Sequence, residues 1–97
     1  MIEVDRIDQG NIVVFRIKGT YYLHREDGPA IIWQDGTKAW YIDGEKHRED
    51  GPAIEWSNGK KEWYLYGECY SSKERWFEAL SEEKRAKAIY SEYFIGG

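Results

Sequence analysis

Length, composition and charge limit what this chain can be. Its 97 residues are enough for one small domain, and the five Trp and eight Tyr among them can stabilise a thin sheet. The net charge is −4, and because residues 71–97 carry five charges of each sign, the acidic excess lies in the N-terminal part. An acidic surface of this kind excludes long nucleic acid and anionic membranes as expected partners.

Cysteine usage and hydropathy point to a location. Cys69 is the only cysteine, so an internal disulfide and a cysteine-rich metal site are excluded, and a lone thiol is typical of a reducing compartment. The first residues lack the pattern of a signal peptide, and no apolar run is long enough to cross a membrane. We therefore expect a cytoplasmic protein without a cofactor or a bound metal.

The chain begins with two strand-like runs, residues 2–7 and 11–17, on either side of Gly10. They predict an opening antiparallel pair. Residues 1–23 resemble a degenerate first unit of the pattern that follows them.

A tandem repeat with a period of 23 residues comes next, and such a period is the strongest signal in the sequence. The string His-Arg-Glu-Asp-Gly-Pro-Ala-Ile occurs at 24–31 and again, letter for letter, at 47–54. Segments 24–45 and 47–68 are identical at 15 of 22 positions, which chance does not produce. We take 24–46 and 47–70 as the two full units.

Each unit predicts two strands and two turns. Asp-Gly-Pro at 27–29 and 50–52 marks one turn, because Gly tolerates unusual φ values and Pro can open the next strand. Asp-Gly at 35–36 and Asn-Gly at 58–59 are short-hairpin signals. Residues 29–34 are thus expected to pair with 38–43, and 52–57 with 61–66, in an antiparallel meander.

Strand alternation sorts the side chains of the predicted sheet onto two faces. One face is uniformly large and apolar and is predicted to be buried: Phe15, Ile17, Ile31, Trp33, Trp40, Ile42, Ile54, Trp56, Trp63 and Leu65. The other is mixed and is predicted to face water: Ile32, Ala39, Tyr41, Glu55, Glu62, Tyr64 and Tyr66.

The C-terminal segment, residues 71–97, predicts two short helices that cap the sheet or its end. Ser-Ser-Lys-Glu at 71–74 fits a capping box and is followed by apolar residues at helical spacing, Trp76, Phe77 and Leu80. Ser81 is the expected cap of a second helix that runs to about Phe94. Its expected apolar stripe is Ala86, Ile89, Tyr90 and Tyr93. The predicted fold is therefore a single α+β domain, 1–97, with an antiparallel β-meander and a helical cap.

The period, the Tyr-x-x-Gly-x-x-His core and the Asp/Asn-Gly turn resemble the MORN repeat. The string His-Arg-Glu-Asp-Gly-Pro-Ala looks like a MORN-like variant of small bacteriophage and bacterial proteins, and it replaces the His-Gly-x-Gly segment of ordinary MORN repeats. The likeness covers residues 10–70. It implies an antiparallel sheet built from hairpins, and a phage-type protein that binds and neutralises a component of its host.

Seven side chains are candidates for contact with a ligand or partner: Arg25, Arg48, His24, His47, Tyr41, Tyr64 and Tyr66. The arginines form a repeated row of donors suited to phosphate or carboxylate, unless they pair with neighbouring acids. The tyrosines either stack on a base or a protein surface or pack across strands. The histidines, each followed by Glu and Asp, form a His/carboxylate site or brace the turns. Exact duplication favours bracing, and their spacing is not that of zinc ligands.

We interpret the chain as a non-catalytic binding protein, because no phosphate loop, serine elbow or nucleophile–base motif is present. Its expected target is a host protein, such as a defence protein, or a small nucleotide signal, and a homo-oligomer is expected. One alternative is a scaffold or virion-associated module that self-assembles through open sheet edges. The other is a hydrolase that uses His24 or His47.

Overall fold

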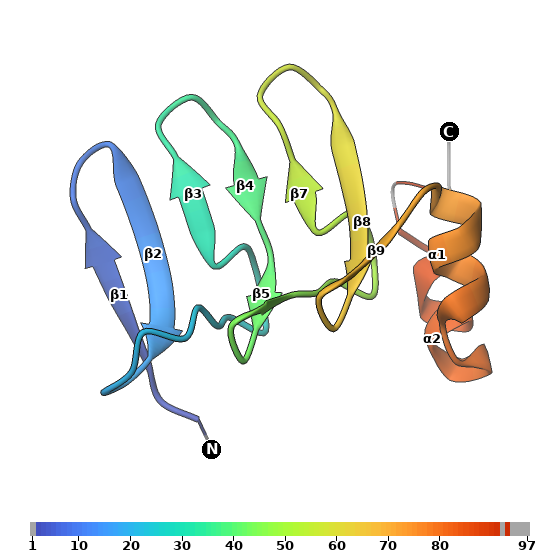
Figure 1. Ribbon diagram of the computed structural model, residues 1–97, viewed down its shortest axis with the longest axis horizontal. Coiled ribbons are helices and arrows are strands. Elements are labelled where there is room, and N and C mark those ends of the chain that lie inside the picture. Colours follow the sequence, from blue (N-terminus) through green and yellow to red (C-terminus); the bar gives the residue numbers. More distant parts are fainter. Residues whose placement is uncertain (1, 92, 94–97) are drawn as a thin grey trace.

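Hairpins stand side by side along the long axis of the molecule in the computed structural model, which describes residues 2–91 and 93 (Figure 1). The main sheet is antiparallel, with the strand order β1-β2-β3-β4-β7-β8-β9. Its strands are β1 (Val4–Asp8), β2 (Ile12–Ile17), β3 (Ile31–Trp33), β4 (Lys38–Ala39), β7 (Ile54–Glu55), β8 (Lys61–Leu65) and β9 (Glu68–Tyr70). The two helices are α1 (Lys73–Ala79) and α2 (Glu82–Ala88). The α+β class and the antiparallel meander with two C-terminal helices are thus confirmed.

A second set of turns lies at the opposite end of the hairpins. The small pair β5 (Tyr41–Ile42) and β6 (Glu45–Lys46) encloses Asp43 and Gly44, whose φ angles are 49° and 81°. Tyr66 and Gly67, between β8 and β9, have φ angles of 48° and 83°. Positive φ at both central residues is the signature of a type I′ turn, which suits a two-residue hairpin.

Backbone hydrogen bonds repeat with the sequence. The N–H of Arg25 donates to the carbonyl of Tyr41 (3.1 Å), and that of Arg48 donates to Tyr64 (3.3 Å). The N–H of His24 reaches the carbonyl of Phe15 (3.0 Å), and His47 makes the same bond to Trp40 (3.1 Å). Phe15 therefore occupies the place of Trp40 in the first hairpin, two residues further from its histidine than in the full unit.

The predicted division of the sheet into two faces is wrong for part of each unit. Ile31 pairs with Ala39, which was predicted on the opposite face, and Ala39 pairs in turn with Ile54. The cause is the tip of the hairpin: the N–H of Trp33 donates to Thr37 (2.9 Å), which leaves a three-residue loop closed by Gly36 at φ 95°. A shift of one residue in register moves every following side chain to the other face.

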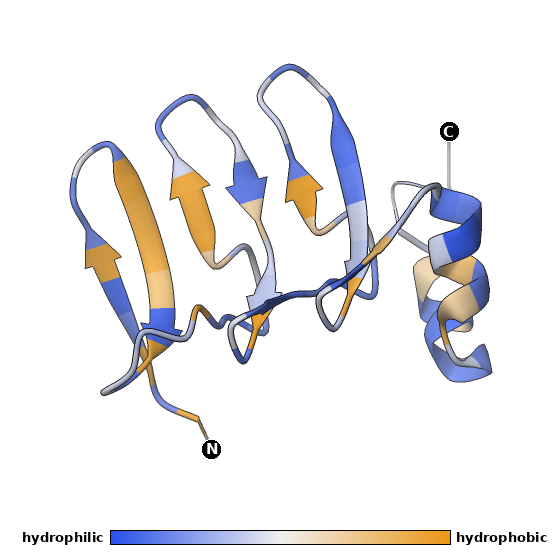
Figure 2. Ribbon diagram, in the orientation of Figure 1, coloured by the Kyte–Doolittle hydropathy of each residue, from blue (hydrophilic) through white to orange (hydrophobic). Residues whose placement is uncertain are grey.

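The tryptophans are consequently divided between the two faces. Trp33 and Trp56 lie on the face of Ile31 and are 36% and 43% exposed, whereas Trp40 and Trp63 follow the flipped parity and lie on the other face. Ala39, predicted to face water, is buried. Figure 2 shows hydrophobic residues concentrated in β2, β3 and β7 and hydrophilic residues at the hairpin tips.

The helices cover the end of the sheet and not a whole face. Trp76 is completely buried, 4.9 Å from the ring of Trp63, and its indole N–H donates to the carbonyl of Arg48 (3.0 Å). The surrounding core consists of Trp63, Leu65, Trp76, Leu80 and Ala88, with Tyr70, Phe77 and Tyr93 packed against it. Of the two predicted arrangements, a cap over the sheet or over its end, the second is confirmed.

The details of the two helices differ from the prediction. Ser72, not Ser71, is the N-cap of α1, and it accepts from the N–H of Arg75, so the capping box is absent. In α2, Ala88 faces the core, while Ala86, Ile89 and Tyr90 of the predicted stripe are exposed. The helix ends at Ala88, with Ile89 as its C-cap, and Phe94 lies outside the described residues. No helix among those described is long and apolar enough to span a membrane.

Candidate functional site

A groove of about 790 Å³ runs along the face that carries Trp40. Residues 25–29 of the first full unit, residues 47–50 of the second, and Lys84 and Lys87 of α2 line it. Trp40 and Ile42 lie in the lining between these segments. The two copies of the His-Arg-Glu-Asp-Gly-Pro segment therefore build one concave site together.

Each arginine is held over an aromatic ring of the preceding unit. The guanidinium carbon of Arg48 lies 3.8 Å from the centre of the Trp40 ring, and that of Arg25 lies 4.1 Å from the centre of Phe15. Nε of Arg48 donates to Asp50 (2.8 Å), and its Nη1 donates to the carbonyl of Pro52 (3.1 Å). Arg25 makes the same two bonds, to Asp27 (3.1 Å) and to the carbonyl of Pro29 (3.2 Å).

Arg48 has further partners that Arg25 lacks among the described residues. Its Nη1 also contacts Glu55 (3.3 Å), and the ring of Tyr93 lies 5.3 Å from its guanidinium carbon. The Arg48 side chain is only 13% exposed, against 27% for Arg25. Arg48 is thus a brace of the loop, with few donors left for a ligand.

Each of the two histidines fastens the type I′ turn of its own unit. Nδ1 of His24 accepts from the N–H of Asp43, and Nδ1 of His47 accepts from the N–H of Tyr66, at 2.9 Å each. Both rings are buried. In this geometry a neutral imidazole carries its proton on Nε2, which lies 3.4 Å from Glu49 in the case of His47. Burial lowers the pKa of His47, and the attraction of Glu49 opposes this only in part.

The three candidate tyrosines lie in different places. Tyr66 lines the groove, is 64% exposed and stacks on His47 at 4.0 Å between ring centres. Tyr64 lies outside the lining, where its hydroxyl donates to Glu62 (3.0 Å) and Lys46 lies 4.9 Å from its ring centre. Tyr41 is half-buried, and burial raises the pKa of its hydroxyl.

The structure thus gathers Arg25, Arg48, His47 and Tyr66 around one groove. His24 lines a neighbouring cavity of about 500 Å³ on the other side of Arg25, beside Phe15 and Val4. Tyr41 and Tyr64 line neither of these two cavities.

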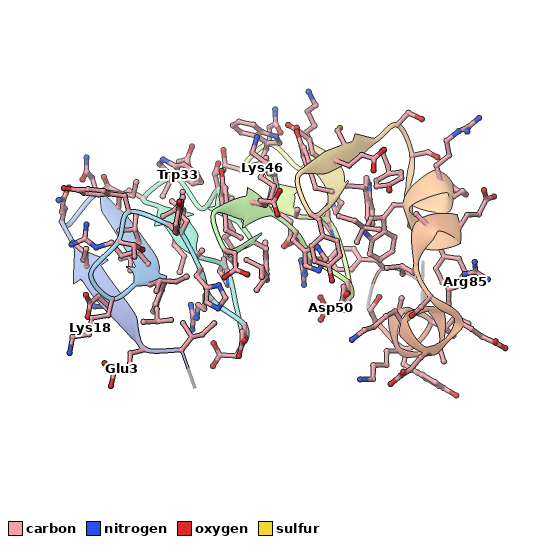
Figure 3. All side chains as sticks on the ribbon, turned by 60° about the horizontal axis from the view of Figure 1, so that its bottom comes forward. Glu3, Lys18, Trp33, Lys46, Asp50 and Arg85 are labelled. Atoms are coloured by element: carbon pink, nitrogen blue, oxygen red, sulfur yellow. The ribbon has the colours of Figure 1, made fainter. Side chains whose placement is uncertain are left out.

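The rims of the groove carry opposite charges. The side chains of Glu26, Asp27 and Asp50 are 77%, 87% and 68% exposed, which makes the rim along the two repeats acidic. At the helical end Lys84 pairs with Glu49 (3.2 Å). Figure 3 labels Asp50, which lies on the opposite side of the sheet from Trp33.

Sequence reasoning missed the lysines of α2 and the lining role of Trp40. Lys84 and Lys87 are three residues apart, the spacing that places two side chains on one face of a helix, so the signal was present. Their position beside the second repeat could not be deduced, because it depends on how the cap docks. Trp40 was assigned to the other face through the register error described above.

Neither a metal site nor a known relative identifies the ligand. Within the described part of the chain, no cluster of three or more His, Cys, Asp or Glu side chains is placed to hold a metal ion. The chain matches no protein-family model, and no curated protein or solved structure is detectably similar to it.

Proposed function

We propose that this protein is a non-catalytic binding module whose groove holds a segment of another protein. The observation that carries the proposal is the groove itself: two repeated polar segments and a helix end converge on it, and Trp40 and Ile42 contribute apolar surface. Concave sites that combine apolar lining with a few polar groups are the usual form of a binding site.

The state of the arginines favours a protein over a nucleotide as the ligand. A phosphate needs free, forked donors in a positive field, and Arg48 already donates to Asp50, Glu55 and the carbonyl of Pro52. Four cationic and four anionic side chains line the groove, so the site has no net positive charge: Arg25, Arg48, Lys84 and Lys87 against Glu26, Asp27, Glu49 and Asp50. A protein segment can match such a mixture.

The exposed parts of the site suggest the chemistry of that segment. The acidic rim of Glu26, Asp27 and Asp50 suits basic side chains, and the net charge of −4 adds to their attraction. Tyr66 and Ile42 suit an apolar or aromatic anchor between them. The proposed partner is therefore a host protein that presents an apolar anchor flanked by lysine or arginine.

Site-specific photo-crosslinking tests the proposal. We would place the photoreactive residue p-benzoylphenylalanine at position 66, in the groove, and at position 21 in a matched variant. Tyr21 is 91% exposed and does not line the groove. Each variant is irradiated in a lysate of the cells that naturally make the protein. We expect one partner to be crosslinked from position 66 and not from position 21.

Charge reversal supplies the control. Glu26→Lys inverts an exposed rim charge, whose contact with Nε2 of His24 is 3.8 Å long, and Glu78→Lys makes the same change on α1, away from the groove. Glu26→Lys should reduce the crosslinked product about tenfold, and Glu78→Lys should leave it unchanged. Equal crosslinking from positions 66 and 21, or a product indifferent to Glu26→Lys, would overturn the proposal. A nucleotide-sized mass on the protein in native mass spectrometry would replace it with the nucleotide hypothesis.

A further inference from the structure

One end of the sheet is covered by a helix and the other is an open edge strand. At the C-terminal end, α1 packs against β8 and β9 and buries Trp63. At the other end, β1 is the outermost strand and has no element beside it among the described residues (Figure 1). Ile2 and Val4 are 48% and 37% exposed there. An open edge strand is a template for pairing with another strand.

The hydrogen-bond phase of β1 shows which of its backbone groups are free. In an antiparallel pair, hydrogen-bonded and non-hydrogen-bonded residue pairs alternate. The N–H of Lys18 donates to Glu3 and that of Gln9 donates to Ile12, at 2.9 Å each, so Glu3 and Gln9 belong to hydrogen-bonded pairs. Asp5 and Ile7 share this phase.

Val4, Arg6 and Asp8 therefore direct their backbone N–H and C=O groups away from β2, towards the open edge. Phe15 confirms this phase from the other strand. It lies opposite Arg6, but its N–H donates to Ala30 and its carbonyl accepts from His24, both on the far side of β2.

We propose that β1 pairs antiparallel with β1 of a second copy of this chain, about a two-fold axis at Ile7. Self-pairing must place outward-facing residues opposite each other, which restricts the axis to a small set of positions. An axis at Ile7 sets Arg6 opposite Asp8 of the second copy, twice by symmetry. An axis at Arg6 would oppose two arginines, and an axis at Asp5 would oppose two aspartates.

A second observation selects the same register. The cross-strand row Ile7, Val14, Ile31, Ala39 and Ile54 runs across the five neighbouring strands from β1 to β7 through successive pairings. It ends at Ile7 on the open edge. The axis at Ile7 places the two Ile7 side chains side by side and so continues this apolar row into the second copy. Charge complementarity and apolar continuity therefore agree. The side chains of Arg6 and Asp8 contact each other at 3.4 Å within one chain, and at 57% and 48% exposed they can also reach a second strand.

Two charge variants test the pairing by sedimentation velocity. A single strand pair is a small interface, so the dimer should form over a range of concentration from about 10 μM to about 1 mM. Arg6→Asp sets acid against acid and Asp8→Arg sets base against base, and each should weaken self-association about tenfold or more. An equimolar mixture of the two variants restores both opposite-charge contacts and should dimerise again. That recovery also shows that both variants are folded.

Cysteine crosslinking reads the register directly. In a Cys69→Ser background, which removes the exposed thiol, Ile7→Cys should form an intermolecular disulfide on mild oxidation. Paired residues on the axis lie about 4.5 Å apart at Cα, within disulfide range. Asp5→Cys is the matched control and should not crosslink. A protein that stays monomeric throughout the concentration range would overturn the proposal, as would a dimer that crosslinks through Asp5→Cys or ignores both charge changes.

Discussion

Replacing Trp76 with alanine should remove most of the stability of the domain. The side chain is completely buried, packs against the Trp63 ring at a tilt of 52° and donates its indole N–H to the carbonyl of Arg48. Truncating a buried aromatic residue costs about 3–5 kcal/mol, and leaving the carbonyl without this donor costs about 1 kcal/mol more. A domain of this size has a free energy of unfolding of about 5–15 kcal/mol, so the variant should be close to unfolding.

A matched variant separates packing from hydrogen bonding. Trp76→Phe keeps most of the ring contact with Trp63 and loses the indole N–H, so it should cost about 1–3 kcal/mol. Urea denaturation followed by far-UV circular dichroism measures both variants and avoids the change in Trp fluorescence that the substitutions themselves cause. If Trp76→Ala lowered the free energy of unfolding by less than about 1 kcal/mol, the helical cap would not be part of the cooperative fold and the reasoning would fail.

Two further predictions concern the repeats. Burial lowers the pKa of His47, so below about pH 6.5 the unfolded chain binds a proton more readily than the folded one. The free energy of unfolding therefore decreases as the pH is lowered. His47→Gln, which can still accept from Tyr66, should flatten the dependence of the free energy of unfolding between pH 7 and about 5; an unchanged slope would contradict the assignment. Gly51→Ala places a Cβ 2.6 Å from the Tyr93 ring, whereas Gly28→Ala meets only the flexible Arg25 guanidinium, at 2.8 Å. Gly51→Ala should therefore lower the free energy of unfolding by about 1–3 kcal/mol more than Gly28→Ala does. Equal melting temperatures of the two variants would show that the Tyr93 ring moves aside.

The architecture could be predicted from the sequence because turn and capping residues mark the ends of its strands and helices. Asp35-Gly36 and Asn58-Gly59 mark the hairpin tips, and Ser81 caps the second helix as predicted, while the cap of the first helix is Ser72, one residue after the predicted position. These signals are local, and local backbone preference is what a sequence reports best. The MORN-like resemblance remains a prediction.

Register and docking could not be predicted in the same way. Asp-Gly is compatible with a two-residue or a three-residue loop, and only the bond from Trp33 to Thr37 decides between them. Tyr66 at positive φ carries no turn signal, because its conformation is imposed by the hydrogen bond to His47 and by Gly67 beside it. The groove depends on both of these features and on where α2 lies, so its lining is a property of the assembled fold.

The same backbone hydrogen bonds join each unit to its neighbour. The fold can therefore accommodate a different number of units. The ring of Trp76 lies 4.9 Å from that of Trp63, and one unit earlier Arg48 lies over Trp40, the residue equivalent to Trp63. The cap docks on the last unit of the sheet, through Trp63, the carbonyl of Arg48 and Glu49. Duplication of one 23-residue unit in frame would lengthen the sheet by two strands, about 10 Å, and add one groove without altering either end. Unequal recombination between the two identical strings offers a direct genetic route to such variants.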